Sequence, residues 1–351
     1  MQAFAERGAL PRGRRLKDLC RKGIPPEKRP RVWFVLSGAQ EAKRAAGPGA
    51  YAALLVRPSI PAEAEWARQI ELARVHLASP VPPPPPLAAA DAPYRRREQD
   101  VPRTFPEQPW LRSARGAAAL RSLLTAYARH APGVGYCQSL NYVAAFVLLH
   151  MPEPEQEEHA FWLFARLVDG VLGADCYGPD LGGLRVTQQA LGRLLASKLP
   201  RLAGHLAALG GDVGLLSTEW LLCAFVLTLP ADTAARVWDS LLLEGPKVLL
   251  RVALALLSRA QDALLAADNL GELMQAAQRH ARSSHDADAL LHTAFYDIGG
   301  MPHRLIAAYR MFGRRELAHE RAERERRRGA QGPRDTKRQA GSWRGALLGL
   351  L

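Results

Sequence analysis

From about residue 110 onward, apolar residues recur at the three- and four-residue spacing of an α-helix. Leu120, Leu123, Leu124 and Tyr127 show this spacing, and few segments alternate as a strand does. Proline and glycine interrupt the pattern at 132–133, 152–154, 170–183, 200, 210–211, 230 and 245–246. The sequence therefore predicts an all-α protein of many short and medium helices, and no repeat of fixed period indicates a solenoid.

The 351 residues are 48% hydrophobic, which is enough for a sizeable core. The longest uninterrupted apolar stretches, 143–149 and 221–226, fall far short of the roughly 20 residues that span a bilayer. Charged residues occupy the N-terminal region where a signal peptide would need an apolar segment. We therefore expect no transmembrane segment and a cytoplasmic protein.

The formal net charge of +13 is concentrated at the two ends of the chain. Residues 1–31 hold 10 basic and 3 acidic side chains, residues 310–351 hold 12 and 5, and the middle is close to neutral. We expect a basic N-terminal segment (1–19), a folded domain (20–310) and a basic, partly disordered tail (311–351). An alternative is that the basic ends bind nucleic acid or an anionic membrane. Because the core is neutral, we expect no specific nucleic acid partner.

Two segments depart from the helical pattern. The first is the proline-rich stretch 72–98, which is expected to form a disordered loop because consecutive prolines favour polyproline II. Its residues 80–86 could alternatively bind an SH3 or WW domain. The second begins at about Gly313, where a charged helix is expected before a basic, Gly-rich end. Neither segment is expected to pack in the core.

Common catalytic and metal-binding patterns are absent. The four cysteines are widely spaced without a C-x-x-C pair, which argues against a zinc site or a disulfide framework. No Walker A, zincin, nucleophile-elbow or EF-hand pattern occurs. Cys137 with His130 or His150 could form a nucleophile and base, but a cysteine in an apolar helix is more often a small hydrophobic residue. We therefore predict no metal site and no cofactor of the protein's own.

Three phrases occur in a fixed order. The first is RKGIP at 21–25, with Arg29 and Trp33 following; the second is DVPRTFP at 100–106; the third is GYCQSLN at 135–141. EWLLCAFVLTLP and then RVWD at 236–239 come later. Together these phrases resemble the TBC family of Rab GTPase-activating proteins over roughly residues 20–310. The resemblance implies a single large multi-helix TBC domain with a concave GTPase-binding face.

The resemblance also implies a mechanism and a set of site residues. Arg103 and Gln138 would be an arginine finger and a glutamine finger, supplied in trans to a GTP-bound Rab. The protein would be a GTPase activator in vesicle trafficking rather than an independent enzyme, and Mg²⁺ and GTP would belong to the partner. Its Rab could hold it peripherally on endomembranes. The supporting residues would be Asp100, Thr104, Tyr136 and Asn141. The structural motif residues would be Gly23, Ile24, Pro25, Arg29, Trp33, Trp238 and Asp239.

The two finger residues suit GTP hydrolysis chemically. The planar, permanently charged guanidinium of Arg103 matches phosphate oxygens, and a primary amide such as that of Gln138 can orient a water molecule. Arg103 could instead form a surface ion pair with Asp100, and Gln138 could merely satisfy backbone groups at a helix start. The surrounding motifs favour the finger roles.

The sequence departs from the family pattern in two places. Ser139-Leu140 replaces the usual Gly-Met, a change that we expect to be tolerated with some risk to the placement of Gln138. Arg97 stands where the family has isoleucine, and joining residue 71 to residue 99 would restore the pattern. We therefore infer a 27-residue insertion, 72–98, from splicing or from the gene model. These departures leave a catalytically weak TBC scaffold, which binds a Rab or an effector without GAP activity, as the alternative function.

Overall fold

The computed structural model describes residues 13–56, 104–178 and 180–330. Within these ranges all regular structure is helical and no strand occurs, so the all-α prediction is confirmed. Several predictions concern residues outside these ranges: Asp100, Arg103, the segment 72–98 with the candidate SH3 or WW ligand at 80–86, and both extreme ends of the chain.

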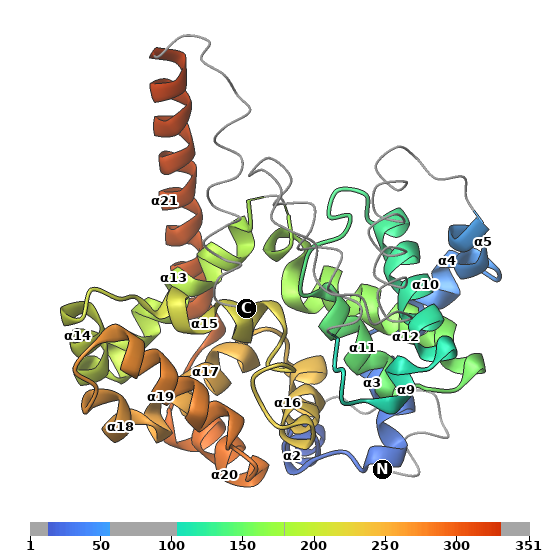
Figure 1. Cartoon of the computed structure of the whole chain (residues 1–351), viewed down its shortest axis with the longest axis horizontal. Helices are drawn as coiled ribbons and strands as arrows, with labels where there is room; N and C mark the ends of the chain where they lie inside the picture. Colours follow the sequence, from blue (N-terminus) through green and yellow to red (C-terminus); the bar gives the residue numbers. More distant parts are fainter. Residues whose placement is uncertain (1–12, 57–103, 179, 331–351) are drawn as a thin grey trace, which may run out of the picture.

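Most of the first group of helices lies on the right in Figure 1, while α2 lies below α16 in the lower middle. Within this group, α12 packs against both α4 and α10, and α10 packs against α11 and α9. The elements of this part of the chain are α2 (Arg14–Lys22), η1 (Pro26–Lys28), α3 (Arg29–Leu36), α4 (Ala39–Ala46), α5 (Ala50–Val56), α9 (Pro109–Arg112), α10 (Ala114–His130), α11 (Leu140–His150), η3 (Pro154–Gln156), α12 (Glu157–Arg166), the π-helical η4 (Leu167–Gly173) and η5 (Ala174–Cys176).

The second group lies on the left in Figure 1, and α16 joins the two groups by packing against α2, α3 and α17. The elements of this part of the chain are α13 (Gly182–Lys198), α14 (Pro200–Ala208), α15 (Val213–Leu222), α16 (Ala231–Glu244), α17 (Lys247–Arg259), α18 (Gln261–Leu265), α19 (Leu270–Arg282), α20 (Ala287–His292), the π-helical η6 (Thr293–Asp297) and α21 (His303–Ala330).

Side-chain caps fix the start of several helices. Ser113 accepts a hydrogen bond from the Gly116 amide at 3.0 Å at the start of α10, and Asn269 accepts one from the Glu272 amide at 3.0 Å at the start of α19. Each bond satisfies an amide that has no partner within its own helix. At the C-terminal end of α16, Gly245 adopts φ 80°, a conformation that glycine adopts without strain.

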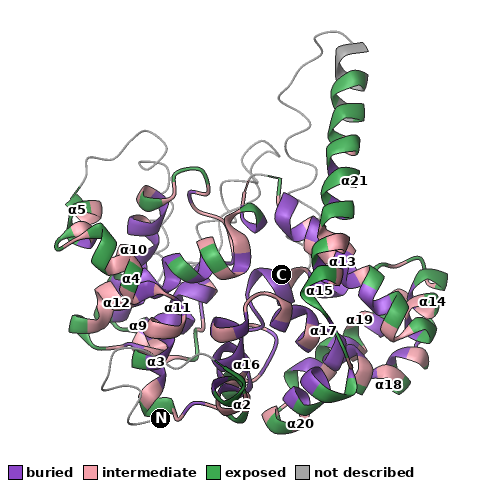
Figure 2. Cartoon of the chain, turned by 180° about the vertical axis from the view of Figure 1, so that it is seen from behind, coloured by how far each residue is buried: buried purple, intermediate pink, exposed green. Residues whose placement is uncertain are grey.

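The core is continuous through both groups of helices, as the inward-facing buried residues show in Figure 2. At its centre three rings pack together: the centroids of Trp33 and Trp238 are 5.6 Å apart, and those of Phe146 and Trp238 are 4.9 Å apart. Both tryptophans are fully buried. Because these rings come from α3, α11 and α16, their packing links elements that are distant in the sequence.

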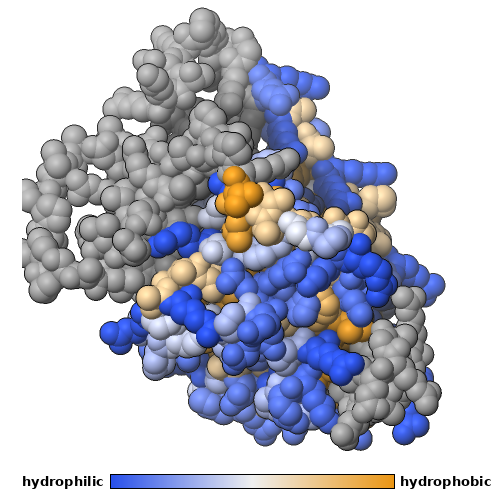
Figure 3. Space-filling model, turned by 90° about the vertical axis from the view of Figure 1, so that its right-hand side faces the viewer, coloured by the Kyte–Doolittle hydropathy of each residue, from blue (hydrophilic) through white to orange (hydrophobic). Residues whose placement is uncertain are grey.

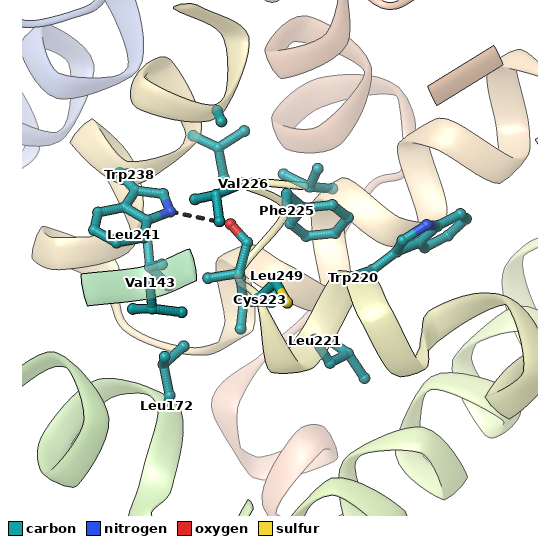
Figure 4. Packing of buried hydrophobic residues seen from close by; sticks show 14 of the residues in the cluster. Val143, Leu172, Trp220, Leu221, Cys223, Phe225, Val226, Trp238, Leu241 and Leu249 are labelled. Carbon is teal, nitrogen blue, oxygen red and sulfur yellow. Dashed lines mark hydrogen bonds between the residues drawn. The ribbon is translucent and has the colours of Figure 1, made fainter. Parts of the chain in front are cut away.

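The segment between α15 and α16 runs through the core without regular structure. Ala224 and Phe225 have φ of 47° and 68°, values that side-chain-bearing residues rarely adopt, and both are fully buried. The indole nitrogen of Trp238 donates to the Ala224 carbonyl at 3.0 Å (Figure 4), and the Tyr177 hydroxyl donates to the Leu222 carbonyl at 2.7 Å. These bonds and the surrounding packing hold the strained turn.

The helix α21 starts at His303 and projects from the body of the molecule (Figure 1). The folded domain was predicted to span residues 20–310. Both of these boundaries fall inside helices, the first in α2 and the second in α21. We expected the tail from about Gly313 not to pack in the core, but Gly313 and Leu317 are buried against α13. These residues are one helical turn apart, so they share the face that meets α13. Beyond them the helix is mostly exposed (Figure 2).

The side of the molecule shown in Figure 3 is mostly hydrophilic where its atoms are described, with a few hydrophobic side chains at the surface. Four large apolar residues are exposed in the described part of the chain: Val56, Tyr296, Met311 and Phe312. Isolated apolar side chains of this kind are normal on a folded protein. No helix in the described ranges has the length and apolar character needed to cross a membrane.

Candidate functional site

The first motif and the RVWD sequence meet at one buried carboxylate, Asp239. Asp239 accepts hydrogen bonds from the Ile24 amide at 2.8 Å and from the Trp33 indole nitrogen at 2.8 Å. Arg29 Nε lies 3.2 Å from the same carboxylate, and both charged side chains are buried. Burial raises the pKa of Asp239, while its bonds to Ile24, Arg29 and Trp33 act in the opposite direction. This cluster binds α3 to α16.

The RKGIP turn itself is fixed by close packing. Gly23 has φ 103° and lies against the Arg236 guanidinium so tightly that a side chain there would collide with it. Pro25 precedes η1, in which Pro26 stands at the first position. Next to this turn, Arg21 forms two hydrogen bonds, 2.7 and 2.9 Å long, with Glu244. No local sequence pattern marks Glu244 as the partner of Arg21, because the two residues are 223 positions apart.

The second and third motifs meet through a chain of hydrogen bonds. The Asn141 amide group donates from Nδ2 to Thr104 Oγ1 at 2.7 Å, and its Oδ1 accepts from the Ser139 backbone amide at 3.1 Å. Thr104, Ser139 and Asn141 are all buried. We call this chain of contacts the Thr104–Asn141–Ser139 bridge. It connects the residue that follows Arg103 to the residue that follows Gln138.

An aromatic contact accompanies the bridge. The rings of Phe105 and Tyr142 lie 5.7 Å apart in an edge-to-face arrangement. Phe105 has φ 45°, and its carbonyl accepts a hydrogen bond from the Gln108 amide at 2.9 Å, which closes a turn before α9. Tyr142 lies just outside the third motif and was not among the predicted site residues. Two features of the sequence could have indicated this contact. Tyr142 directly follows the third motif, and the second motif contains an aromatic residue, Phe105.

Gln138 is half-buried and lies two residues before α11. Tyr136 is also half-buried and packs against the core. Arg103 and Asp100 lie outside the described residues, so Thr104 is the first described residue of the second motif. The described geometry therefore covers Gln138 and the supporting residues Thr104, Tyr136 and Asn141.

Ser139 adopts an unusual backbone conformation, with φ 94° and ψ −28°. This region favours glycine, which is the residue that the family pattern has at this position. The Ser139 hydroxyl is buried and has no hydrogen-bond partner within the described residues. A strained backbone and an unsatisfied hydroxyl each cost on the order of 1–3 kcal/mol. The serine is thus a costly substitution next to Gln138.

The two histidines considered as a base for Cys137 are engaged elsewhere. His150 Nδ1 lies 2.8 Å from the Phe146 carbonyl, and its ring packs 4.6 Å from that of Trp33. Burial lowers the pKa of His150, so the ring is kept neutral in the core. His130 Nε2 lies 3.7 Å from Asp169. These contacts explain both histidines as structural residues. No group of side chains suited to hold a metal ion occurs in the described ranges.

Comparisons with known proteins give one consistent result. A family model, the Rab-GTPase-TBC domain, matches residues 26–265. Growth hormone-regulated TBC protein 1 of Homo sapiens is 35% identical over 269 residues, which are 76% of this chain and 70% of that protein. This similarity was expected from RKGIP, RVWFVLSGAQ and GVGYCQ and is confirmed. TBC1 domain family member 2A of Mus musculus is 34% identical over 307 residues, and the match spans only 30% of that protein.

Solved structures agree. The crystal structure of the Chlamydomonas flagellar RabGAP TBC domain has a TM-score of 0.69 and 34% sequence identity, covering 85% of this chain and 90% of that one. The Ypt/Rab-GAP domain of Gyp1p has a TM-score of 0.58 at 20% identity, covering 81% and 92%, and supports the fold alone.

Proposed function

The chain belongs to the Rab-GTPase-TBC domain family, and we propose that it accelerates GTP hydrolysis by a Rab-type GTPase through Arg103 and Gln138. Members of this family act as GTPase activators. The finer assignment, that both residues act in trans on GTP bound to the partner, is our proposal. The observation that supports it best is the Thr104–Asn141–Ser139 bridge.

The bridge matters because two separate loops must be held in register for this chemistry. Thr104 is covalently next to Arg103, and Ser139 is next to Gln138. Asn141 contacts both, and all three are buried, so solvent does not compete for the hydrogen bonds. An amide such as Asn141 can donate and accept at once, which a carboxylate or a hydrophobic side chain cannot do here.

The chemistry then follows from what GTP hydrolysis requires. Negative charge develops on the phosphate oxygens, and a guanidinium stabilises it. The attacking water must be held in line, and a glutamine amide can accept from it and donate to a phosphate oxygen. An arginine finger contributes about 10³ to 10⁵ in rate, or roughly 4 to 7 kcal/mol of barrier. GTP and Mg²⁺ arrive with the partner, so the protein needs no cofactor of its own.

The proposal is tested by single-turnover GTP hydrolysis across a panel of GTP-loaded Rabs. The intact protein is compared with Arg103→Ala, Gln138→Ala and a form that lacks residues 72–98. Strong acceleration of at least one Rab, abolished in Arg103→Ala and reduced in Gln138→Ala, is the expected result. Acceleration that survives Arg103→Ala would refute the finger assignment.

Ser139 favours a second function, the catalytically weak TBC scaffold. Its strained backbone and buried, unpartnered hydroxyl lie directly next to Gln138. A displaced glutamine could leave Rab binding intact while it slows hydrolysis. Measurable binding of a GTP-loaded Rab, with no acceleration by any form of the protein, would support this function over GAP activity.

Other partner assignments remain proposals. A polyproline ligand for an SH3 or WW domain at 80–86 falls outside the described residues. We propose that the protein is cytoplasmic and reaches endomembranes through its Rab. Binding to RNA that disappears with the basic ends of the chain would contradict the assignment of no specific nucleic acid partner.

A further inference from the structure

An open surface cavity of about 620 Å³ lies among α18, α19 and the turn that leads to α20. Figure 1 places these helices at the opposite end of the molecule from α9 and α10. Ala263 and Ala276 form its apolar lining. Its polar lining consists of Arg279, His280, Arg282, Ser283 and His285. None of the described residues that line this cavity carries a carboxylate.

The two arginines of the cavity lack counter-charges. Some arginines on helix surfaces pair with acids, as Arg185 does with Glu320 at 2.5 Å and Arg236 with Asp288 at 2.6 Å. Among the described residues, neither Arg279 nor Arg282 forms a salt bridge or a side-chain hydrogen bond. The two lie three residues apart on α19, so their side chains are neighbours on the helix surface. An anion between them would relieve their mutual repulsion.

His280 adds a third nitrogen-bearing side chain. Its Nε2 is shielded from solvent and has no hydrogen-bond partner within the described part of the chain. Burial lowers the pKa of His280, and the positive charge of Arg259 at the end of α17 lowers it further. Arg259 likewise has no ion pair among the described residues. Two arginines and two histidines therefore line the cavity, and a further cation, Arg259, lies close enough to act on His280.

The end of α19 would oppose an anion if its carbonyl groups were free, because a helix C-terminus carries partial negative charge. Several of those carbonyls accept hydrogen bonds instead. The hydroxyls of Ser283 and Ser284 both donate to the His280 carbonyl, at 3.1 and 2.8 Å, and the Ser283 amide donates to the Arg279 carbonyl at 3.0 Å. These hydrogen bonds reduce the negative potential that the end of α19 presents to the cavity.

We propose that this cavity binds a compact phosphorylated polyanion through Arg279, Arg282 and His280. Guanidinium groups match phosphate oxygens with paired hydrogen bonds, and a second phosphate can be held by the neighbouring arginine. The cavity is large enough for several phosphate groups on a small carrier. Such a ligand can be a free polyphosphorylated molecule or a phosphorylated lipid headgroup. The site is separate from the bridge and does not depend on the proposed GAP function.

The test uses the full chain and two probes. Binding of inorganic tripolyphosphate is measured by isothermal titration calorimetry. Binding to phosphatidylcholine vesicles, with or without phosphatidylinositol bisphosphate, is measured by sedimentation. The test variant is Arg279→Gln/Arg282→Gln. The matched control is Arg44→Gln/Arg201→Gln, which removes the same charge from exposed positions on α4 and α14. Both variants should keep the GAP activity of the intact protein, because neither touches the bridge.

We expect the intact protein and the control to bind at least one probe, and the test variant to bind at least about tenfold more weakly, as expected for the loss of two charge-assisted contacts. Binding of tripolyphosphate alone would identify a free polyanion, and headgroup-dependent sedimentation would identify a lipid. Equal weakening in the test and control variants would overturn the proposal, because it would show only general surface attraction. Failure of the intact protein to bind either probe would also overturn it.

Discussion

At the scale of single residues, Asn141 makes one local hydrogen bond, from the Ser139 amide, and one distant hydrogen bond, to Thr104. The family resemblance marked Asn141 and Thr104 as supporting residues, but it did not show that they bond to each other across 37 positions. These two residues meet despite their separation in the sequence because α11 begins beside Thr104. Sequence reasoning found the residues; only the fold brings them into contact.

Thr104→Val should weaken both stability and activity. The change keeps the shape of the side chain but removes the oxygen that accepts from Asn141, which leaves a buried amide donor unsatisfied. We expect the free energy of unfolding to fall by about 1–3 kcal/mol. We also expect the single-turnover GTP hydrolysis rate to fall by about 10- to 100-fold, because the finger loops lose their register. Urea unfolding and stopped-flow hydrolysis measure the two effects.

Thr104→Ser is the matched control, since it retains the hydroxyl. Its hydrolysis rate should stay within a few-fold of the intact protein, and Rab binding should be little changed in both variants. An unaffected rate in Thr104→Val, with folding intact, would contradict a positioning role for the bridge.

Ser139→Gly should stabilise the protein. Glycine adopts the observed φ of 94° without strain and removes the buried hydroxyl. Against this, glycine increases the conformational entropy of the unfolded chain, which lowers the free energy of unfolding by about 0.4–1 kcal/mol. We expect a net gain of about 1 kcal/mol in the free energy of unfolding, together with faster GTP hydrolysis if the serine disturbs Gln138. A lower melting temperature in differential scanning calorimetry would show that the serine is not strained.

At the scale of elements, the breaker pattern predicted short and medium helices but did not fix where each helix ends. Gly211 and Pro230 suggested one helical segment between them, whereas α15 ends at Leu222 and a turn follows. The turn depends on positive φ at Ala224 and Phe225, two residues that give no local signal of it. Its stability comes from bonds made by Trp238 and Tyr177, which lie far away in the sequence.

The long helix α21 shows a second difference of this kind. Gly313 suggested a boundary before the charged tail, but the helix continues through it. A Cβ atom at Gly313 would lie 2.5 Å from Gln189 Oε1 of α13, so the glycine lets the two helices pack closely there rather than ending α21. Glycine alone does not distinguish these two uses, because both exploit its missing side chain.

Leu317→Ala should destabilise the contact between α21 and α13. Leu317 is 6% exposed, whereas Met311 on the same helix is 45% exposed. We expect the free energy of unfolding to fall by about 2–5 kcal/mol for Leu317→Ala. Met311→Ala, as the control, should cost about 0.5 kcal/mol or less. Equal effects of the two substitutions in urea unfolding would show that α21 does not contribute its buried face to the core.

The ion pair between α2 and α16 makes stability depend on pH. Burial would raise the pKa of Glu244, but the hydrogen bonds and charges of Arg21 and Lys247 outweigh it and lower that pKa below its ordinary value of 4.5. The charged form is therefore favoured in the folded protein, so its contribution is present above pH 4.5 and is lost as the pH falls through the folded-state pKa.

Glu244→Gln should accordingly lower the free energy of unfolding by about 1–3 kcal/mol at neutral pH, because Arg21 loses its partner. The difference from the intact protein should shrink as the pH falls below 4.5. Urea unfolding at a series of pH values measures it. A difference that is constant down to the acid limit would contradict a charged Glu244 in the native state.

At the scale of the whole molecule, motifs at opposite ends of the domain meet in the fold. Asp239 in α16 receives hydrogen bonds from Ile24, Arg29 and Trp33, more than 200 positions earlier. The family resemblance predicted that these residues serve the structure together, but it gave no geometry. Composition and periodicity predicted the all-α class. Pairings of this sequence separation could not be predicted, because local pattern carries no information on which distant faces meet.

The central claim, that Arg103 acts as a finger on a Rab's GTP, is tested most directly by comparing Arg103→Ala with Arg97→Ala in single-turnover hydrolysis of the Rab that the intact protein accelerates most. Both changes remove one arginine from the same stretch of chain. We predict that Arg103→Ala lowers the rate by about 10³-fold or more while Arg97→Ala leaves it within a few-fold of the intact protein. Equal rates for the two variants would contradict the account.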